Sequence, residues 1–473
     1  MLCGIKIFEM NKIKLLCLLA VVMFFVLACD DDPEIALSDE VDELEEVSEL
    51  SLDSETGIVH SWTNQFLELE QYASGRPNGA ARAIAYIYLA AYETAVPQML
   101  NLVSQDDRLR GLRIRGNQAN QINTEVALNA CFETVLSHFL SNLSEDQVNQ
   151  IETFASQIEE ELSIDLDEEL VENSRVWGEY VADQVIRYSQ SDDKAEAQIL
   201  DPQPLSYEPP VGDGFWTYSA DPERALFPYW ESVRTFVISP DETTAVDPIA
   251  YSEDPESDYY AQMEEIYEAN NAAREEDGEQ LWIAEFWSDD VEGLMISPPA
   301  RQVSIANQLV EQYELGLDET LSLYVKLGFA LNDAAVSAWK YKYEYMVMRP
   351  NVFIHEFMDP DFQTNLYRLI YWPNPSFPGY PSGHSTFASA AGGIFIDFFG
   401  NSTNFTDRTH EDREEFRGMP RSFSSFEELA EENAFSRIPL GVHMRMDCAE
   451  GLRLGYEIAD AVNSLDLSSP DGI

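Results

Sequence analysis

Residues 377–393 read FPGYPSGHSTFASAAGG, a proline- and glycine-rich turn followed by small residues that suit a helix. Ser382 can cap a helix that begins at the next residue. The backbone amides of Gly383 and His384 would then point outward from the positive end of that helix, which favours binding of a tetrahedral oxyanion. A capped helix start without a ligand is the alternative interpretation.

Helical patterns extend on both sides of this segment. Apolar residues recur at three- and four-residue spacing in the stretches 79–103, 121–163, 168–189, 319–348, 383–399 and 441–462. Ser144 and Glu145 mark a cap and turn within the second stretch. The sequence lacks both the period-2 alternation of a sheet protein and an internal repeat. It therefore predicts an all-α fold, one large domain of packed bundles with its two halves at residues 58–195 and 301–465.

The region between the halves, residues 196–300, has a different composition. Prolines interrupt it repeatedly, and four tryptophans are scattered among its acidic residues, Trp216, Trp230, Trp282 and Trp287. We expect ordered irregular structure that covers a site, with a surface loop of no function as the alternative.

The N-terminus has the features of a targeting segment. Lys12 and Lys14 precede an apolar run that ends at Ala28-Cys29, which resembles a bacterial lipoprotein signal with Cys29 as the lipidated residue. An ordinary cleaved signal peptide is the alternative. The following residues, 30–57, are rich in acids and predict an extended tether. The sequence thus predicts signal peptide 1–29 and an exported lipoprotein, attached to the bacterial envelope only through lipid.

The composition is strongly acidic. The chain has 473 residues, and its 86 Asp and Glu against 28 Lys and Arg give a formal net charge of −58. Such a surface repels a phosphate backbone, so nucleic-acid binding is excluded, and a saline medium is indicated. Beyond Cys29 only Cys131 and Cys448 remain. We interpret both as buried small hydrophobes, with a single disulfide as the alternative.

A second segment, residues 339–350, carries two cations. Lys342 and Arg349 are seven residues apart, so on a helix they would project from one face, and Pro350 prevents the helix from continuing far. A surface pair with extended aliphatic stems is the alternative.

A third segment, residues 436–447, carries Arg437, His443 and Asp447. His443 and Asp447 are four residues apart, which on a helix face would let the carboxylate fix the tautomer of the imidazole and raise its basicity. A structural His–Asp pair is the alternative. Together the three segments supply three cations, an amide-rich helix start, a hydroxyl and two histidines, which suits a phosphate-shaped oxyanion. The other four histidines are assigned no role, His60, His138, His355 and His410.

The three segments, in this order and at this spacing, resemble the signature of the vanadium-dependent haloperoxidases and type 2 phosphatidic acid phosphatases. The detailed resemblance covers residues 325–455. It implies an all-helical fold of four-helix bundles that binds vanadate or phosphate between them.

The resemblance also implies a role for each residue. Lys342, Arg349 and Arg437 would neutralise the equatorial oxygens of vanadate, and the Ser382 hydroxyl and Gly383 amide would complete the cradle. His443 would be the axial ligand of vanadium. Three residues would take part in catalysis: His384 as acid/base, Lys342 on the bound peroxide, and Asp447 at the last motif position.

Two features favour the peroxidase branch over a phosphatase that acts through a phosphohistidine on His443. About 280 folded residues precede the first motif, whereas soluble phosphatases of this superfamily are compact. Trp339 and Phe377 match aromatic positions of the halide pocket in chloroperoxidases and in bacterial iodide-oxidising relatives. We therefore expect hydrogen peroxide, halide and small organic acceptors as partners, with iodide favoured over bromide. A lipoprotein that only binds the oxyanion, without catalysis, is a third hypothesis.

Overall fold

Helices make up most of the computed structural model, which confirms the predicted all-α fold. The structure describes residues 52, 54, 56–114, 121–218, 223–276, 278–289, 291–368, 374–414 and 417–468. The predicted signal peptide and nearly all of the predicted tether lie outside these residues. Among the described helices, none has the length and apolar character needed to cross a membrane.

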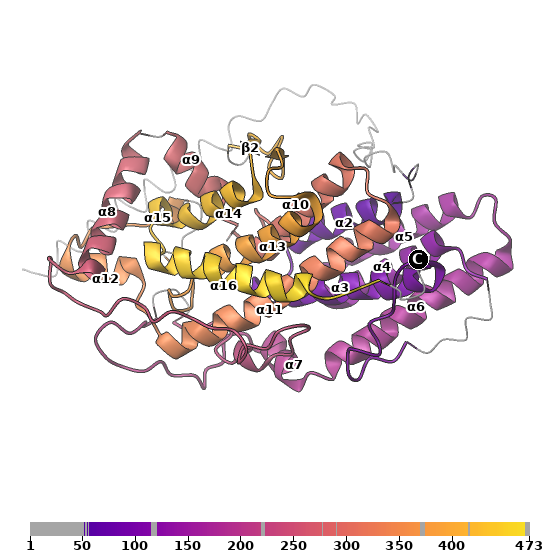
Figure 1. Cartoon of the computed structure of the whole chain (residues 1–473), viewed down its shortest axis with the longest axis horizontal. Coiled ribbons are helices and arrows are strands. Elements are labelled where there is room, and N and C mark those ends of the chain that lie inside the picture. Colours follow the sequence, from indigo (N-terminus) through magenta and orange to yellow (C-terminus); the bar gives the residue numbers. More distant parts are fainter. Residues whose placement is uncertain are drawn as a thin grey trace, which may run out of the picture. The chain divides into compact units, whose positions relative to one another are not determined.

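The first half of the fold is a group of packed helices. It consists of α2 (Gly57–Glu70), α3 (Asn78–Ala95), η1 (Val96–Gln98), α4 (Thr124–Phe139), α5 (Glu145–Leu162), α6 (Glu168–Gln190) and α7 (Asp193–Leu200). The predicted cap at Ser144 is confirmed, because its side chain accepts from the Gln147 amide while the Gln147 side chain accepts from the Ser144 amide. Helix α4 packs against both α3 and α6, and these helices gather at one end of Figure 1.

The second half is built on three long helices that contact one another in the centre of Figure 1, α11 (Leu317–Tyr345), α13 (Gly383–Phe399) and α16 (Arg445–Asn463). Around them lie α10 (Pro298–Gln312), α12 (Pro350–Phe357), η3 (Asn365–Arg368), α14 (Phe426–Phe435) and α15 (Arg437–Leu440). Helix α11 also packs along α3, so it joins the two halves. Because almost every residue of its middle is buried, it forms the core of the described chain.

Glycines allow α16 to approach α13 closely. A Cβ added to Gly455 would lie 2.0 Å from Ser389 Oγ, and one added to Gly451 would lie 2.6 Å from the Ser382 carbonyl oxygen. Only glycine permits this contact. The close approach brings the N-terminus of α13 next to the first turn of α16, where Asp447 lies.

The region predicted to be irregular is partly helical, and the prediction is wrong there. It contains η2 (Trp230–Ser232), α8 (Asp258–Glu276) and α9 (Glu279–Phe286). Tyr259, Met263 and Ile266 of α8 are buried in a cluster with residues of α12 and α15. Their spacing is helical, but the prolines nearby and the many acidic residues obscured it.

A short antiparallel hairpin is the one sheet among the described residues. Strands β1 (Phe405–Asp407) and β2 (Arg421–Phe423) pair with Phe405 opposite Phe423 and Asp407 opposite Arg421. Three-residue strands are too short to show a period-2 pattern, so the sequence did not reveal them. Cys131 and Cys448 are both buried and unpaired, as predicted.

Candidate oxyanion site

Lys342 and Arg349 come from two different elements, so the prediction of one shared helix face is wrong. Helix α11 ends at Tyr345, and Met346 takes a left-handed conformation with φ 51° that turns the chain. Arg349 is then the N-cap residue of α12, with Pro350 at the first helical position. Both cations are fully buried, which excludes the alternative of a surface pair.

The ammonium group of Lys342 lies among carbonyl oxygens of the loop before α13. Its Nζ donates to the carbonyls of Pro378 and Gly379 at 3.1 Å each, and also to that of Pro381. Burial, reinforced by Arg349, lowers the pKa of Lys342 well below its usual value. Three acceptors therefore hold this cation in place before any anion is considered.

Two aromatic rings form a wall beside the cations. The rings of Trp339 and Phe377 contact each other with centroids 4.8 Å apart. Lys342 Nζ lies 5.6 Å from the Trp339 ring and 5.1 Å from the Phe377 ring, and the Arg349 guanidinium lies 5.0 Å from the latter. The predicted halide-pocket residues are thus adjacent to the predicted oxyanion residues, and each ring faces a cation.

His443 and Asp447 form a pair across the start of α16 rather than on a helix face. His443 precedes Met444, the N-cap residue, while Asp447 lies in the first turn and also accepts from the Met444 amide at 3.0 Å. Asp447 Oδ2 lies 3.0 Å from His443 Nδ1, and Arg349 Nη1 lies 3.2 Å from His443 Nε2. A guanidinium can only donate, so Nε2 accepts and the ring proton resides on Nδ1.

The electrostatics of His443 differ from the expectation that Asp447 raises its basicity. Burial, together with Arg349, Lys342, Arg437 and His384, lowers the pKa of His443 well below 6.5. Burial has the opposite effect on the pKa of the Asp447 carboxyl, which it raises. The imidazole is therefore neutral, with the lone pair of Nε2 facing a cation.

Ser382 caps α13 and connects this helix to α16. Its side chain accepts from the Ser385 amide, and its own amide donates to the Asp447 carbonyl at 2.9 Å. The next residue, Gly383, lies against the Trp339 ring, since an added Cβ would be 3.3 Å from Trp339 Cζ3. The helix start predicted from the sequence therefore contacts both other motif segments.

The segment after α9, which contains Trp287 and Ser288, forms one side of the site, and none of the three motifs includes it. Arg437 Nη1 donates to the carbonyls of Trp287 at 3.0 Å and Ser288 at 3.3 Å. His384 Nε2 lies 3.0 Å from the same Ser288 carbonyl, so this nitrogen carries a proton. The sequence marks Trp287 only as one of four tryptophans in a region predicted to cover a site, and backbone acceptors leave no sequence signal.

The three segments thus form one buried, cationic site. Lys342, Arg349 and Arg437 are fully buried with the single carboxylate Asp447, so with Lys342 protonated these four residues carry an excess of two positive charges. Such an excess is costly unless an anion balances it. Among the described residues no group of three or more His, Cys, Asp or Glu could hold a bare metal ion. The buried positive charges of this site suit an oxyanion, and His443 adds a neutral ring nitrogen beside them.

The fold is helical and its buried cationic site has the chemistry that suits an oxyanion, and comparisons with known proteins show which family it resembles. Residues 322–468 match the family model described as "VCPO second helical-bundle domain". This match confirms the resemblance to the vanadium haloperoxidases that the three motifs predicted.

Individual relatives agree with this assignment. Over 215 residues the chain is 25% identical to "Vanadium chloroperoxidase" of Curvularia inaequalis, a match covering 35% of each protein, about a third of the length of that relative. The structure titled "Crystal structure of the first bacterial vanadium dependant iodoperoxidase" is 26% identical, with a TM-score of 0.77 and coverage of 88% of this chain and 98% of that one. A holo-type bacterial vanadium-dependent chloroperoxidase, 16% identical with a TM-score of 0.63, shares the fold over 84% of this chain and 94% of its own.

Proposed function

We propose that the protein is a vanadate-dependent haloperoxidase, which uses hydrogen peroxide to oxidise halide to hypohalous acid. The observation that carries the proposal is the neutral His443 ring, whose Nε2 lone pair faces the buried cations. A tetrahedral oxyanion with an electrophilic centre needs both features, positive charge for its oxygens and a lone pair for its central atom.

The residues present fit vanadate as cofactor. Arg349, Arg437 and Lys342 would hold its oxygens by charge, with the Ser382 hydroxyl and the Gly383 amide at the helix start. His443 would bind vanadium through Nε2. Bound vanadate supplies activation of hydrogen peroxide toward attack by halide.

The protein's own residues would handle the proton and exclude water. His384 holds a proton on Nε2 against the Ser288 carbonyl and would serve as acid/base for peroxide. Asp447 keeps the proton of His443 on Nδ1, so that Nε2 remains a ligand. Trp339 and Phe377 are both buried and would keep the halide pocket dry, which strengthens electrostatic interactions there.

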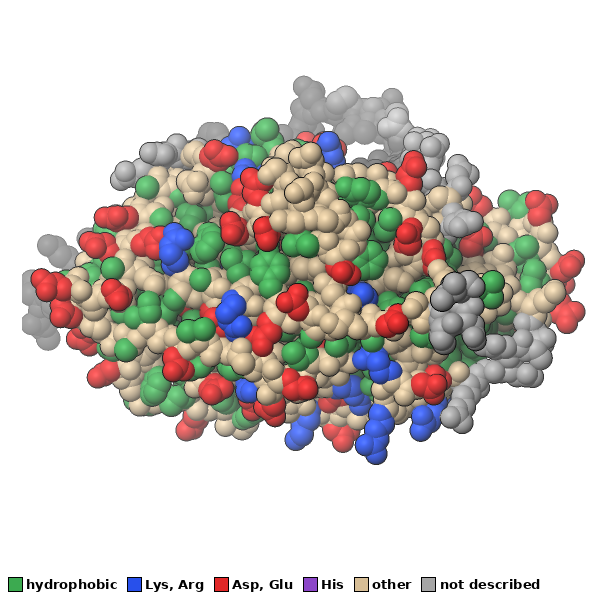
Figure 2. Space-filling model, viewed as in Figure 1, with side chains coloured by type: hydrophobic (Ala, Val, Ile, Leu, Met, Phe, Trp, Pro, Cys, Tyr) green, Lys and Arg blue, Asp and Glu red, His purple; other side chains and the backbone are tan. Residues whose placement is uncertain are grey.

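Iodide is the proposed preferred halide, followed by bromide. Iodide gives up electrons most readily, and the structural neighbour with 26% identity is titled an iodoperoxidase. The acidic surface also bears on halide entry: Figure 2 shows Asp and Glu side chains across the whole viewed face, with fewer Lys and Arg. Small organic acceptors would react with the hypohalous acid.

The cellular location proposed from the sequence is the bacterial envelope, with a lipid on Cys29 as the only membrane attachment. Support comes from the basic and apolar residues that precede Ala28-Cys29. Metabolic labelling with a fatty acid in a bacterial host tests this, with Cys29→Ser as control. Equal labelling of both proteins would contradict it.

The test of the activity uses purified protein stripped with a chelator. We expect orthovanadate to restore peroxide-dependent oxidation of iodide strongly, of bromide more weakly and of chloride little, and phosphate to compete. Restoration by haem or iron salts but not by vanadate would contradict the proposal. Hydrolysis of phosphate monoesters without halide oxidation would favour the phosphatase alternative, because the His443–Asp447 pair also suits a nucleophile. Oxyanion binding without either reaction would favour a binding protein.

A further inference from the structure

A second buried group of charges lies behind the segment that contacts His384 and Arg437. Its centre is Arg301 of α10, which is fully buried. Arg301 binds Asp289 with two donors, Nη2 at 3.1 Å from Oδ1 and Nε at 3.3 Å from Oδ2, and its Nη1 lies 3.4 Å from Asp407 Oδ2. Its Nη2 also contacts His410 Nε2. These four residues are called the Arg301 cluster below.

Arg301 also holds the backbone and rings of the same segment. Its Nη2 donates to the Phe286 carbonyl, and its guanidinium lies 4.7 Å from the Phe286 ring and 5.0 Å from the Trp287 ring. A single buried side chain therefore binds residue 286, the last of α9, and residues 287 and 289 of the segment that follows. A planar guanidinium suits this role because its five donors are fixed in one plane.

The hairpin β1–β2 supplies the other side of the cluster. Asp407 ends β1, and its Oδ1 accepts from the Thr409 amide at 2.9 Å, which fixes the turn that carries His410. His410 Nε2 must accept from Arg301, so the ring is neutral, and its pKa is lowered by burial and by Arg301. His410, which the sequence left without a role, thus has a structural position next to the site.

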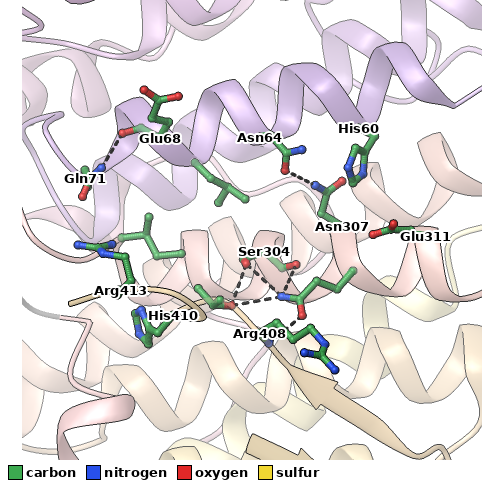
Figure 3. A pocket seen from close by; sticks show the side chains of 14 residues that line it. His60, Asn64, Glu68, Gln71, Ser304, Asn307, Glu311, Arg408, His410 and Arg413 are labelled. Carbon is green, nitrogen blue, oxygen red and sulfur yellow. Dashed lines mark hydrogen bonds between the residues drawn. The ribbon is translucent and has the colours of Figure 1, made fainter. Parts of the chain in front are cut away.

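The cluster is shielded from solvent by this neutral ring. A cavity of about 520 Å³ lies between α2, α10 and residues 408–413, and Figure 3 shows His410 at its edge. Among the described residues that line the cavity, His410 is the one member of the cluster. The ion pairs of Arg301 therefore remain in a medium of low dielectric constant, where charge-assisted hydrogen bonds are strong.

Asp289 connects the cluster to the oxyanion site through one peptide bond. It has a left-handed backbone with φ 47°, a conformation that residues other than glycine adopt at a cost. The carbonyl of Ser288, which accepts from both His384 and Arg437, belongs to the peptide that ends at the Asp289 nitrogen. Anchoring the Asp289 side chain to Arg301 therefore fixes the direction of that carbonyl.

We propose that Asp289 and Arg301 are positioning residues that hold the Ser288 carbonyl against His384 and Arg437, and so orient the acid/base and one cation of the oxyanion site. The proposal rests on the proposed function only for the chemical roles of His384 and Arg437. The proposal explains why Asp289 keeps a left-handed backbone: this conformation holds the Ser288 carbonyl where it accepts from both His384 and Arg437.

The test compares Asp289→Asn with a matched control, Asp333→Asn. Asp333 is also a fully buried carboxylate that anchors a backbone segment, since it accepts from the amides of residues 236, 237 and 238. Melting temperature measures the structural cost of each change, and calorimetric titration of metal-free protein with orthovanadate, then with phosphate, measures oxyanion affinity. We expect both variants to melt earlier, but only Asp289→Asn to weaken oxyanion binding, by tenfold or more. The proposal would be overturned if both variants melted earlier but each bound the oxyanions within twofold of the wild-type affinity.

Two further measurements keep the outcome clear. If Asp289→Asn does not fold, Arg301→Lys replaces it, since lysine keeps the charge but loses the bidentate contact, and the same affinity comparison applies. Crystal structures of the variant and the wild type test the geometry without any ligand: the Ser288 carbonyl should move away from His384 in the variant, and an unchanged contact would overturn the proposal. Failure of the proposed function is recognised separately, because wild-type protein would then bind the oxyanion without oxidising iodide.

Discussion

The oxyanion site and the Arg301 cluster are two buried groups of charges on either side of residues 286–289, and their charge balance differs. In the cluster one guanidinium faces two carboxylates, Asp289 and Asp407. In the oxyanion site three cations face the single carboxylate Asp447 among the residues that the motifs supply. The cluster has no excess of positive charge for an anion to offset, whereas the excess of buried positive charge in the oxyanion site is costly unless an anion offsets it. The difference therefore separates a positioning device from a binding site.

Replacing the histidine of each group should give the largest difference between the two groups in vanadate binding. His443→Ala removes the lone pair at the centre of the cations, and we expect retention of vanadate to be abolished. His410→Ala removes a neutral ring that contacts Arg301, and we expect the variant to bind vanadate within about tenfold of the wild type while melting earlier. Vanadium content after gel filtration measures the first effect. Loss of vanadium from the His410 variant alone would reverse the two assignments.

His384 separates catalysis from binding within the oxyanion site. We expect His384→Ala to retain vanadate but to lower kcat for iodide by roughly 10²- to 10⁴-fold, because an acid/base group is lost. Steady-state rates at saturating peroxide, normalised to bound vanadium, measure this. A variant that releases vanadate with normal kcat per remaining vanadium would show that His384 binds rather than transfers protons.

The pH dependence of stability tests the charge balance directly. Burial raises the pKa of Asp289, but the Arg301 guanidinium outweighs burial, and the pKa is lowered to about 2. The ionised form therefore stabilises the fold above the unfolded pKa of about 3.9, and this stabilisation is lost as pH falls toward 2. Burial raises the pKa of Asp333 to about 6 against the backbone amides that lower it. Its protonated form therefore stabilises the fold, and this contribution is lost as pH rises from about 4 to 6.

Opposite slopes follow for the two asparagine variants. Relative to the wild type, the destabilisation by Asp289→Asn should shrink between about pH 4 and 2, and that by Asp333→Asn should shrink between about pH 4 and 6. Urea unfolding from pH 3 to 7 measures the part of both effects that lies in this range. Parallel slopes would mean that Arg301 does not keep Asp289 ionised.

Ionic strength should give the smallest effect. The formal charge of −58 opposes halide approach at long range, while the buried cations act only nearby. Screening shortens the Debye length from about 10 Å at 0.1 M to about 3 Å at 1 M salt. We therefore expect kcat/KM for iodide to rise a few-fold as a non-halide salt is added. A rate that falls would show that the buried cations, not the acidic surface, govern halide approach.

The sequence alone determined the helical class and the members of the three motifs. Helical periodicity and caps such as Ser144 and Ser382 are properties of contiguous residues, so α5 and α13 begin where the sequence predicts. It did not determine how Lys342 and Arg349 meet, because the left-handed turn at Met346 places them on separate elements.

Only the tertiary structure decided what surrounds the motifs. Arg301 and His410 are 109 residues apart in sequence, and Arg437 contacts a carbonyl 149 residues away. A backbone carbonyl such as that of Ser288 has the same chemistry in every residue, so no residue type marks it as an acceptor. The pKa of His443 depends in the same way on burial and on cations brought from other elements, which outweigh the nearby Asp447. Local sequence specifies which groups are available, and packing of distant segments specifies their directions, protonation and partners.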